Sequence, residues 1–209
     1  MKCLVCATEN AKPYTEGSAE DCLKCWHCGL VWVNPRHFPS PEREKRRYLQ
    51  HKNSLGEPAY LAYLARAAAP VADLQPDGAR GLDYGCGPVE GMKHILEPRL
   101  SVESYDPIFF PREELLKFRY DFVLCIEAAE HFHDPLKEFT RMDSVLVRGG
   151  FLGVSSLLLP PPADFARWHY RRDFTHVTFY GEDTVRWIAD HFAWEIVSLQ
   201  SPLWVMRKA

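Results

Sequence analysis

The chain has 209 residues, of which 46% are hydrophobic and 13% aromatic, so it can bury a sizeable core and is not a disordered protein. Its formal net charge of −3 argues against a protein whose main partner is nucleic acid, because such proteins usually carry a basic excess. No apolar run approaches the roughly 18 residues of a membrane helix. The opening stretch MKCLVCATEN lacks the apolar core and cleavage site of a signal peptide, so we expect a cytoplasmic protein without a membrane partner.

Cysteines at fixed spacing dominate the N-terminal region. Cys3 and Cys6 form one CxxC pair, and Cys22, Cys25 and Cys28 follow at equal intervals of three. Either neighbouring pair of these three fits a zinc ribbon by loop length. Four thiolates close a tetrahedral zinc site to solvent, which indicates a structural zinc rather than a catalytic one.

Gly29 helps to choose the second pair. A glycine after the second cysteine tolerates the positive φ of a tight metal-binding turn, and only the Cys25/Cys28 pair has one. Residues 20–24 and 30–33 are then the strands entering and leaving the turn, with Cys22 an ordinary strand residue and His27 exposed. The predicted zinc ligands are Cys3, Cys6, Cys25 and Cys28.

The remaining chain divides into two further parts. Residues 1–38 form the predicted zinc-ribbon subdomain, and Pro39 and Pro41 mark a helical connector over 39–76. The connector contains a charged helix over 41–53, interpreted as a solvated face, and an alanine- and leucine-rich helix from 57 until Pro70.

Residues 77–209 alternate between strands and helices, which predicts a Rossmann-like α/β domain with helices on both faces of a parallel sheet. Strands are expected at 79–84, 100–105, 121–126 and 150–155, and helices at 89–97, 135–146 and 182–192. Two closing strands, 194–198 and 203–206, are expected to form an antiparallel pair.

The turn GLDYGCGPVEG, residues 81–91, follows the first of these strands, where open α/β sheets bind ligands. Gly85 and Gly87 fit the start of a dinucleotide fingerprint, but Glu90 occupies the third glycine position and disfavours a pyrophosphate. Asp83 favours a cation or a hydroxyl, and Asp106, at the end of the second strand, is placed for ribose hydroxyls. This pattern favours S-adenosylmethionine, a cationic nucleoside, as the cofactor.

Three later features accompany the turn. A buried strand ends in Glu127 and is followed by Glu130-His131, a Gly149-Gly150 turn precedes the next strand, and HYRRDFTHVTFY occupies 169–180. With the ribbon's CxxCGLVxxNP ending at 25–35, the sequence resembles class I S-adenosylmethionine-dependent methyltransferases, and more narrowly the branch with an N-terminal zinc ribbon, over nearly its whole length.

The resemblance implies a set of cofactor-binding residues. They are Asp83, Gly85, Cys86, Gly87, Asp106, Ile126, Glu127 and Ala128. The sequence departs from the family where it has Val89 in place of a glycine, and no acidic residue is evident for the adenine amino group between Asp106 and Asp121.

Methyl transfer also needs an aligned acceptor and, for some acceptors, a group that takes a proton. The candidates for catalysis are His169, His176 and Asp173, in a segment expected to cover the pocket. The candidates for binding a small-molecule substrate are Glu130, His131, Tyr170, Arg171 and Arg172, the arginines for an anionic group. The competing interpretation makes the histidines structural and the Arg172-Asp173 pair a surface cluster.

The sequence lacks the Asn-Pro-Pro-aromatic motif with which the family's base-amino methyltransferases hold a planar nitrogen, so O- or C-methylation of a small molecule is expected. A methyltransferase acting on RNA or protein through the ribbon is one alternative, although residues 1–35 carry more acidic than basic side chains. A non-catalytic binding module with a degenerate cofactor pocket is the other.

Overall fold

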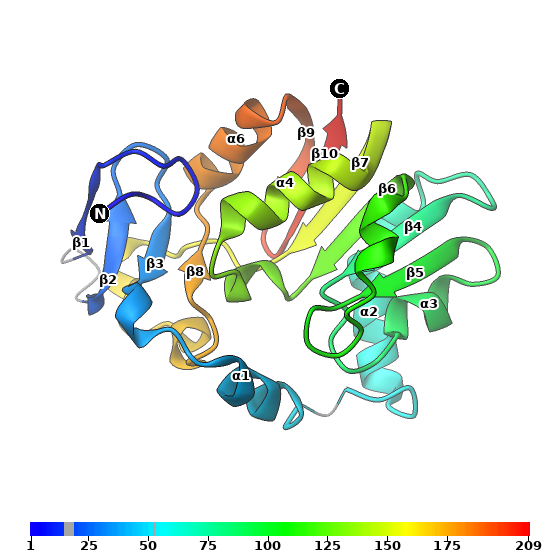
Figure 1. Cartoon of the computed structure of the whole chain (residues 1–209), viewed down its shortest axis with the longest axis horizontal. Helices are drawn as coiled ribbons and strands as arrows, with labels where there is room; N and C mark the ends of the chain where they lie inside the picture. The colour runs from blue at the N-terminus through cyan, green and yellow to red at the C-terminus, as the bar shows by residue number, and fades with distance from the viewer. Residues whose placement is uncertain (15–18, 52) are drawn as a thin grey trace.

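The computed structural model describes residues 1–14, 19–51 and 53–209. Within this part of the chain the strands form two sheets, a six-stranded sheet of order β5-β4-β6-β7-β10-β9 and a four-stranded sheet of order β1-β2-β3-β8. The smaller sheet lies to one side of the larger one (Figure 1).

The strands of the smaller sheet are β1 (Ala11–Tyr14), β2 (Ala19–Cys25), β3 (Val31–Val33) and β8 (Thr178–Phe179). Those of the larger sheet are β4 (Arg80–Tyr84), β5 (Ser101–Tyr105), β6 (Tyr120–Ile126), β7 (Leu146–Ser155), β9 (Trp194–Gln200) and β10 (Leu203–Lys208). The α-helices are α1 (Pro41–Tyr48), α2 (Pro58–Ala72), α3 (Gly91–Leu96), α4 (Pro135–Val145), α5 (Pro162–Phe165) and α6 (Glu182–His191). Short 3₁₀ helices are η1 (Pro35–His37), η2 (Glu113–Lys117), η3 (Ala129–His131) and η4 (His169–Arg172).

The connections of the larger sheet locate a ligand crevice. Strands β5, β4, β6 and β7 run parallel, and β10 pairs antiparallel with both β7 and β9, as expected for the two closing strands. From β4 the chain passes to β5 on one side and then to β6 on the other. The strand order therefore reverses beside β4, and such a point opens a crevice at the carboxyl ends of the strands.

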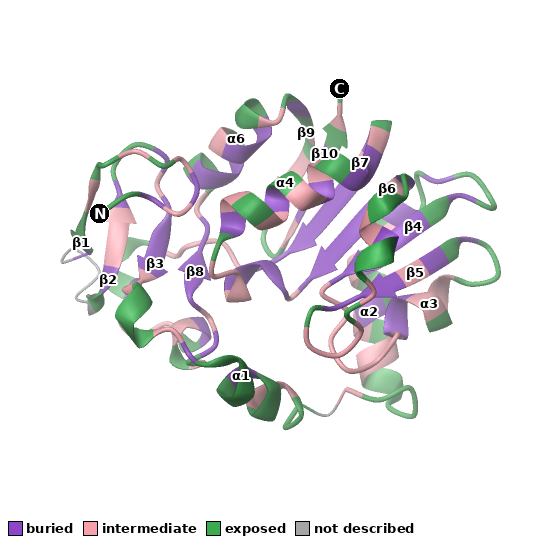
Figure 2. Cartoon of the chain, viewed as in Figure 1, coloured by how far each residue is buried: buried purple, intermediate pink, exposed green. Residues whose placement is uncertain are grey.

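Both faces of the larger sheet are covered. Along β6, Phe122 and Leu124 pack into a cluster with α2 and α3, while Val123 and Cys125 pack into a second cluster with α4 and α6. From Phe122 to Ile126 the strand is therefore continuously apolar and buried rather than alternating, because each face meets helices (Figure 2). The mixed α/β fold with a central sheet and helices agrees with the expectation.

The smaller sheet is joined to the larger domain through a strand that sequence reasoning missed. β8 consists of two residues and pairs antiparallel with β3, opposite Val31 and Trp32. Cys3, Cys28 and Trp32 share one apolar cluster with residues of β4, α4 and α6. The N-terminal region thus packs directly on the α/β domain, and the division at residues 38 and 76 stays a prediction.

Several expected boundaries were wrong. The helix expected over 41–53 ends at Tyr48, and residue 52 of that range lies outside the described residues. The next helix passes through Pro70 to Ala72, because Val71 and Ala72 are buried against the sheet and Arg99 donates hydrogen bonds to the carbonyl of Ala72 and to that of Gln75.

Two further boundaries changed for local reasons. The helix expected from 89 begins at Gly91, since the glycine turn extends to Glu90. The Gly149-Gly150 pair lies within β7, which begins at Leu146 directly after α4 and is irregular at that point. Among the described residues, no helix combines the length and apolar character needed to cross a membrane.

Candidate active site

A cavity of about 560 Å³ lies at the carboxyl ends of β4, β5 and β6. α1 and α2 contribute to its wall from the N-terminal side of the chain, and the segment before β8 contributes from the C-terminal side. Within the described residues, six carboxylates and no lysine or arginine line it: Glu44, Asp83, Asp106, Glu127, Glu130 and Asp173. This lining suits a cationic ligand.

The glycine turn forms the floor of the cavity. Gly85 has φ +81°, and a Cβ atom there would come within 2.7 Å of the Ala128 side chain, so the position needs glycine on both grounds. A Cβ at Gly87 would meet nothing within 4 Å, and this residue faces the cavity. The turn therefore leaves backbone exposed to a ligand.

Asp83, the last residue but one of β4, is only 4% exposed. Burial, together with the neighbouring carboxylates of Asp106 and Glu90, raises its pKa to about 8. A cation bound beside Asp83 would restore the ionised form of its carboxyl group. A sulfonium or an ammonium group supplies such a positive charge. The residues present thus fit S-adenosylmethionine.

Asp106 holds the turn in shape. One of its carboxylate oxygens accepts from the amides of Ile108 and Phe109 at 2.8 and 2.9 Å, and the other accepts from the amide of Gly87 at 2.9 Å. The carboxylate also lines the cavity, so its expected bond to ribose hydroxyls adds to a positioning role that the sequence did not indicate.

Glu90 does not have the position that the sequence led us to expect. Its carboxylate forms an ion pair with Arg112 at 2.8 Å and does not line the cavity. The case against a pyrophosphate therefore does not rest on Glu90. It rests on the carboxyl-rich lining, in which an ionised member such as Asp173 repels an anionic ligand.

The far side of the cavity follows β6. Ile126, Glu127 and Ala128 all line it, as expected, and so do Cys86 and the other expected cofactor residues. Glu127 adopts a left-handed backbone with φ +50° and accepts a hydrogen bond from Ser155 Oγ at 2.7 Å. This strained turn directs the Glu127 carboxylate into the cavity.

Glu130 lies at the polar end of the cavity and is fully buried. Burial and the charge of Glu127 raise its pKa to about 8. The nearby hydroxyls of Ser156 and Tyr170 lower that pKa in part, yet they bond to each other at 3.2 Å. Neither carboxylate oxygen of Glu130 has a hydrogen-bond partner among the residues that the structure describes.

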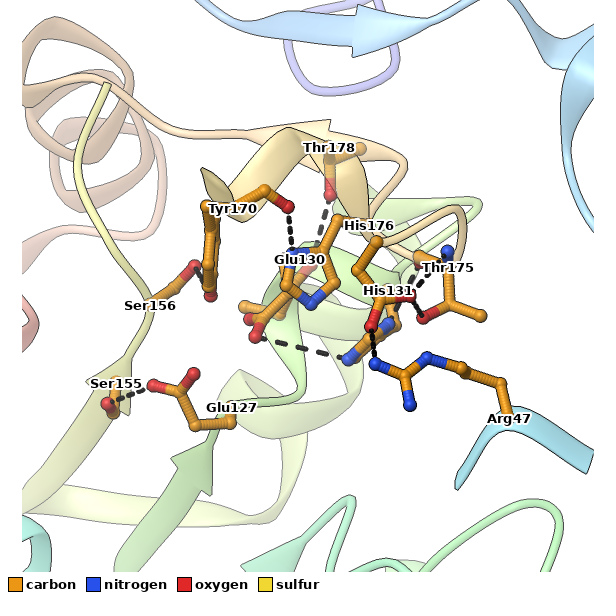
Figure 3. A network of polar contacts seen from close by, with 12 residues as sticks. Arg47, Glu127, Glu130, His131, Ser155, Ser156, Tyr170, Thr175, His176 and Thr178 are labelled. Carbon is orange, nitrogen blue, oxygen red and sulfur yellow. Dashed lines mark hydrogen bonds and ion pairs between the residues drawn. The ribbon is translucent and has the colours of Figure 1, made fainter. Parts of the chain in front are cut away.

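His131 and His176 face Glu130 (Figure 3). His131 Nδ1 lies 2.9 Å from the carbonyl of Thr175, and His176 Nδ1 lies 2.7 Å from the carbonyl of Tyr170. Because a carbonyl only accepts, each Nδ1 carries the proton and each Nε2 keeps its lone pair. Burial lowers the pKa of both rings, that of His176 to about 3, so both are neutral near pH 7.

Asp173 connects this end of the cavity to α1. It pairs with Arg47 at 2.6 Å and accepts from the amide and the hydroxyl of Thr175. Burial opposes ionisation, but the bonds from Thr175 and Arg47 lower the pKa of Asp173 to about 2. Asp173 is therefore ionised and committed to these bonds, and it positions its segment.

The structure does not bring every expected residue to the cavity. His169 is exposed. Arg171 pairs with Asp21 at 2.9 Å, and Arg172 donates only to the backbone of Arg167. Tyr170 lies behind His176, with the two ring centroids 4.1 Å apart. None of the four lines the cavity, so neither arginine is placed to hold an anionic substrate there.

Other lining residues come from the connector, where sequence reasoning assigned none. Glu44 and Tyr48 of α1 and Tyr60 and Tyr63 of α2 line the cavity. Glu44 and Tyr48 are four residues apart and therefore lie on one face of α1. This spacing was the sequence signal for a buried face within a charged stretch that was interpreted as solvated.

The four expected metal ligands of the N-terminal region lie together. Cys3 and Cys28 sulfurs are 3.5 Å apart, as are those of Cys6 and Cys25, and all four lie within 4.8 Å of one another. Sulfurs around a tetrahedral zinc at about 2.3 Å are roughly 3.8 Å apart, so the donor set fits. Cys22 packs instead with Tyr14 and Val31, and burial raises its pKa to about 12.

The strand order of the larger sheet reverses beside a glycine turn, and Asp83 and Asp106 lie at the carboxyl ends of its first two strands. These features define a Rossmann-like ligand-binding domain. A family model described as a methyltransferase domain matches residues 48–199. The chain belongs to this methyltransferase family. No curated protein matches the sequence.

Solved structures share the fold at low sequence identity. The 1,6-didemethyltoxoflavin-N1-methyltransferase of Burkholderia thailandensis, solved with its substrate and S-adenosylhomocysteine, is 13% identical with a TM-score of 0.58 over 86% of this chain and 96% of its own. An O-methyltransferase family 2 protein of Planctomyces limnophilus in complex with apigenin is 16% identical with a TM-score of 0.50 over 71% of this chain and 60% of its own.

Proposed function

We propose that this chain is an S-adenosylmethionine-dependent methyltransferase that methylates a small molecule on oxygen or carbon. The carrying observation is one cavity that joins a glycine turn and a buried carboxylate, Asp83, to a polar end formed by Glu130, His131 and His176. When bound, S-adenosylmethionine supplies an electrophilic methyl group on a sulfonium.

The cofactor end is assigned to residues that surround the turn. Asp83 favours the cationic part, Asp106 holds the turn and adds a ribose contact, and Ile126, Glu127 and Ala128 form the opposite wall. The other end of the cavity, which Glu44, Tyr48 and His131 line, is proposed to bind the methyl acceptor.

The polar end favours oxygen or carbon acceptors. Such acceptors lose a proton, and the unprotonated Nε2 of His131 is proposed to take it, because His176, with a pKa of about 3, is too weak a base near pH 7. The lack of lysine and arginine among the described lining residues argues against a nucleic acid or other polyanion. A cytoplasmic location remains part of the proposal.

The cysteine cluster is proposed to hold a structural zinc. Four cysteines leave no coordination position for substrate, and amides of Val5 and His27 donate to the sulfurs of Cys3 and Cys25 at 3.4 Å. The zinc would fix the small sheet that packs on the domain.

Calorimetry tests the function. We expect S-adenosylmethionine and S-adenosylhomocysteine to bind the wild-type protein and Asp83→Asn to bind S-adenosylmethionine about 10- to 100-fold more weakly, because a bond to a charged group contributes roughly 1.5–3 kcal/mol. Asp121→Asn is the matched control, since Asp121 accepts from the Arg80 amide at the opposite end of the sheet.

Failure of both compounds to bind the wild-type protein below millimolar concentration contradicts an enzyme and favours a non-catalytic module. If they bind, transfer of a labelled methyl group to a panel of hydroxyl compounds and carbon acids, followed by mass spectrometry, identifies the acceptor atom.

A further inference from the structure

We propose that Glu130, His131 and His176 bind a divalent transition-metal ion at the polar end of the cavity, at a site distinct from the cysteine cluster. Two imidazoles and a carboxylate form a donor set that suits such ions. One ligand atom from each residue lies within 4.8 Å of the other two.

The geometry is close to that of a metal site. Donor atoms about 2.1 Å from an ion are roughly 3.4 Å apart at tetrahedral angles. His131 Nε2 lies 3.9 Å from Glu130 Oε1, and the three ligand atoms lie within 4.8 Å of one another, so side-chain rotations that shorten these separations by about 0.5–1.4 Å would complete the coordination. Figure 3 shows the three side chains converging from η3 and from the segment before β8.

Glu130 provides the independent observation that points to a ligand. It is 0% exposed, faces the cavity, and lacks a hydrogen-bond partner for either oxygen within the described residues. A buried carboxylate without partners is costly, whereas a coordinated cation satisfies both its charge and its lone pairs. In the part of the chain that the structure describes, no lysine or arginine lines the cavity to serve instead.

The two histidines are oriented as metal ligands usually are. Each donates its Nδ1 proton to a backbone carbonyl, which fixes the ring and directs the Nε2 lone pair toward the cluster. The backbone is held as well, since the amide of Val177 donates to the carbonyl of Glu130 at 2.8 Å. The donors are thus carried on mutually anchored segments.

Surrounding charges favour a cation. The carboxylates of Glu44, Glu127 and Asp173 also line the cavity, and Arg47 is engaged by Asp173. Three protein ligands leave coordination positions directed toward the cavity, where an acceptor oxygen can bind. That last role rests on the proposed function, whereas binding of the ion does not.

Metal titrations of the full chain, first given one zinc per chain so that only the cysteine cluster, whose thiolates prefer zinc, is filled, test the site. Manganese is followed by electron paramagnetic resonance and zinc by calorimetry. Manganese favours nitrogen and oxygen donors over thiolates, which separates the two sites. We expect one further ion per chain, with affinity reduced at least about tenfold in Glu130→Gln and in His176→Gln. His169→Gln, which changes an exposed histidine of the same segment, is expected to bind as the wild type does.

Thermal unfolding distinguishes a ligand from a structural role. Without added metal, Glu130→Gln is expected to be about as stable as the wild type, because neither carboxylate oxygen has a hydrogen-bond partner among the described residues that the change would break. Added manganese is expected to raise the Tm of the wild type but not that of the variant.

Absence of a further ion of either kind, or unchanged affinity in both variants, overturns the site. If one variant does not fold, the other decides. Binding of S-adenosylhomocysteine, measured on the same samples, tests the proposed function separately. If S-adenosylhomocysteine binds and no further metal ion does, only the metal site is wrong.

Discussion

At the scale of single residues, two buried carboxyl groups of the cavity lack a cationic partner among the described residues. Asp83 and Glu130 both have their pKa raised to about 8, chiefly by burial. They lie at the two ends of one cavity, Asp83 beside the glycine turn and Glu130 beside the histidines. Each end therefore suits a positive group, the proposed cofactor at one end and the proposed metal ion at the other.

The raised pKa of Asp83 predicts a pH dependence of cofactor binding. Below about pH 8 the free protein holds a proton on Asp83, and a bound cation must expel it. We expect the affinity for S-adenosylmethionine to rise with pH up to about 8, by at most about tenfold per pH unit. Calorimetry in buffers of different ionisation enthalpy measures the released proton.

Asp83→Asn is the control for this effect, since it cannot release the proton. An equal change of affinity with pH in Asp83→Asn contradicts the assignment.

The raised pKa of Asp83 also predicts how the stability of the ligand-free protein changes with pH. An unfolded aspartate titrates near 3.8, so the folded state holds the extra proton between about pH 4 and pH 8. The stability contribution of Asp83 in the ligand-free protein therefore falls as pH rises across that window.

At the scale of elements, two segments close the cavity from opposite ends of the sequence. α1 brings Glu44 and Tyr48, and the segment before β8 brings Asp173 and His176. The ion pair between Arg47 and Asp173 is a direct link between them. Tyr48 also packs edge-on against His131, with ring centroids 5.1 Å apart.

Loss of that link is expected to loosen α1. Arg47→Met keeps most of the side chain but removes the charge, and an ion pair of this partly exposed kind contributes up to roughly 1 kcal/mol, or about fivefold in an opening equilibrium. We expect amide hydrogen exchange in residues 41–48 to become about fivefold faster.

Arg46→Met is the matched control, because Arg46 is an exposed neighbour on the same helix. Equal acceleration in both variants attributes the effect to helix propensity or surface charge. Acceleration in Arg47→Met alone supports the link to Asp173.

Local patterns predicted an α/β element well where the strand carries a continuous apolar run, as Phe122 to Ile126 does. They failed where tertiary contacts decide. Pro70 stays within α2 because its neighbours pack on the sheet, and β8 is too short to leave a periodic signal.

The candidate site shows the same division. The expected cofactor residues follow strands in sequence and all line the cavity. The choice between His169 and His176 depended on a backbone turn at 169–172 that no residue pattern specifies. Glu44 was hidden in a charged run because its exposed neighbours dominate the composition.

At the scale of the whole molecule, the cysteine-bearing sheet is part of the site's support. β3 pairs with β8, and Thr178 and Tyr180 donate to the carbonyl of Ala129 at 3.0 and 2.9 Å. This chain of contacts leads from the cysteine cluster through β8 to η3, which carries Glu130 and His131. The small sheet therefore positions the polar end of the cavity but not the glycine turn.

Loss of the proposed zinc is expected to reach one end of the cavity and not the other. Cys25→Ser removes a ligand, and because zinc binding is coupled to the folding of such small sheets, the ion is lost and amides of residues 176–180 exchange at least about tenfold faster. Cys22→Ser makes the same chemical change three residues earlier, in the apolar cluster with Tyr14 and Val31, and is expected to keep one zinc per chain. The amides of Gly85 and Gly87, held by Tyr105 and Asp106, are expected to exchange equally in both variants. Zinc content by mass spectrometry and exchange rates at these two sets of amides check the proposal together. Zinc loss from Cys22→Ser overturns the ligand assignment, and zinc loss from Cys25→Ser without faster exchange at 176–180 overturns the link through β8.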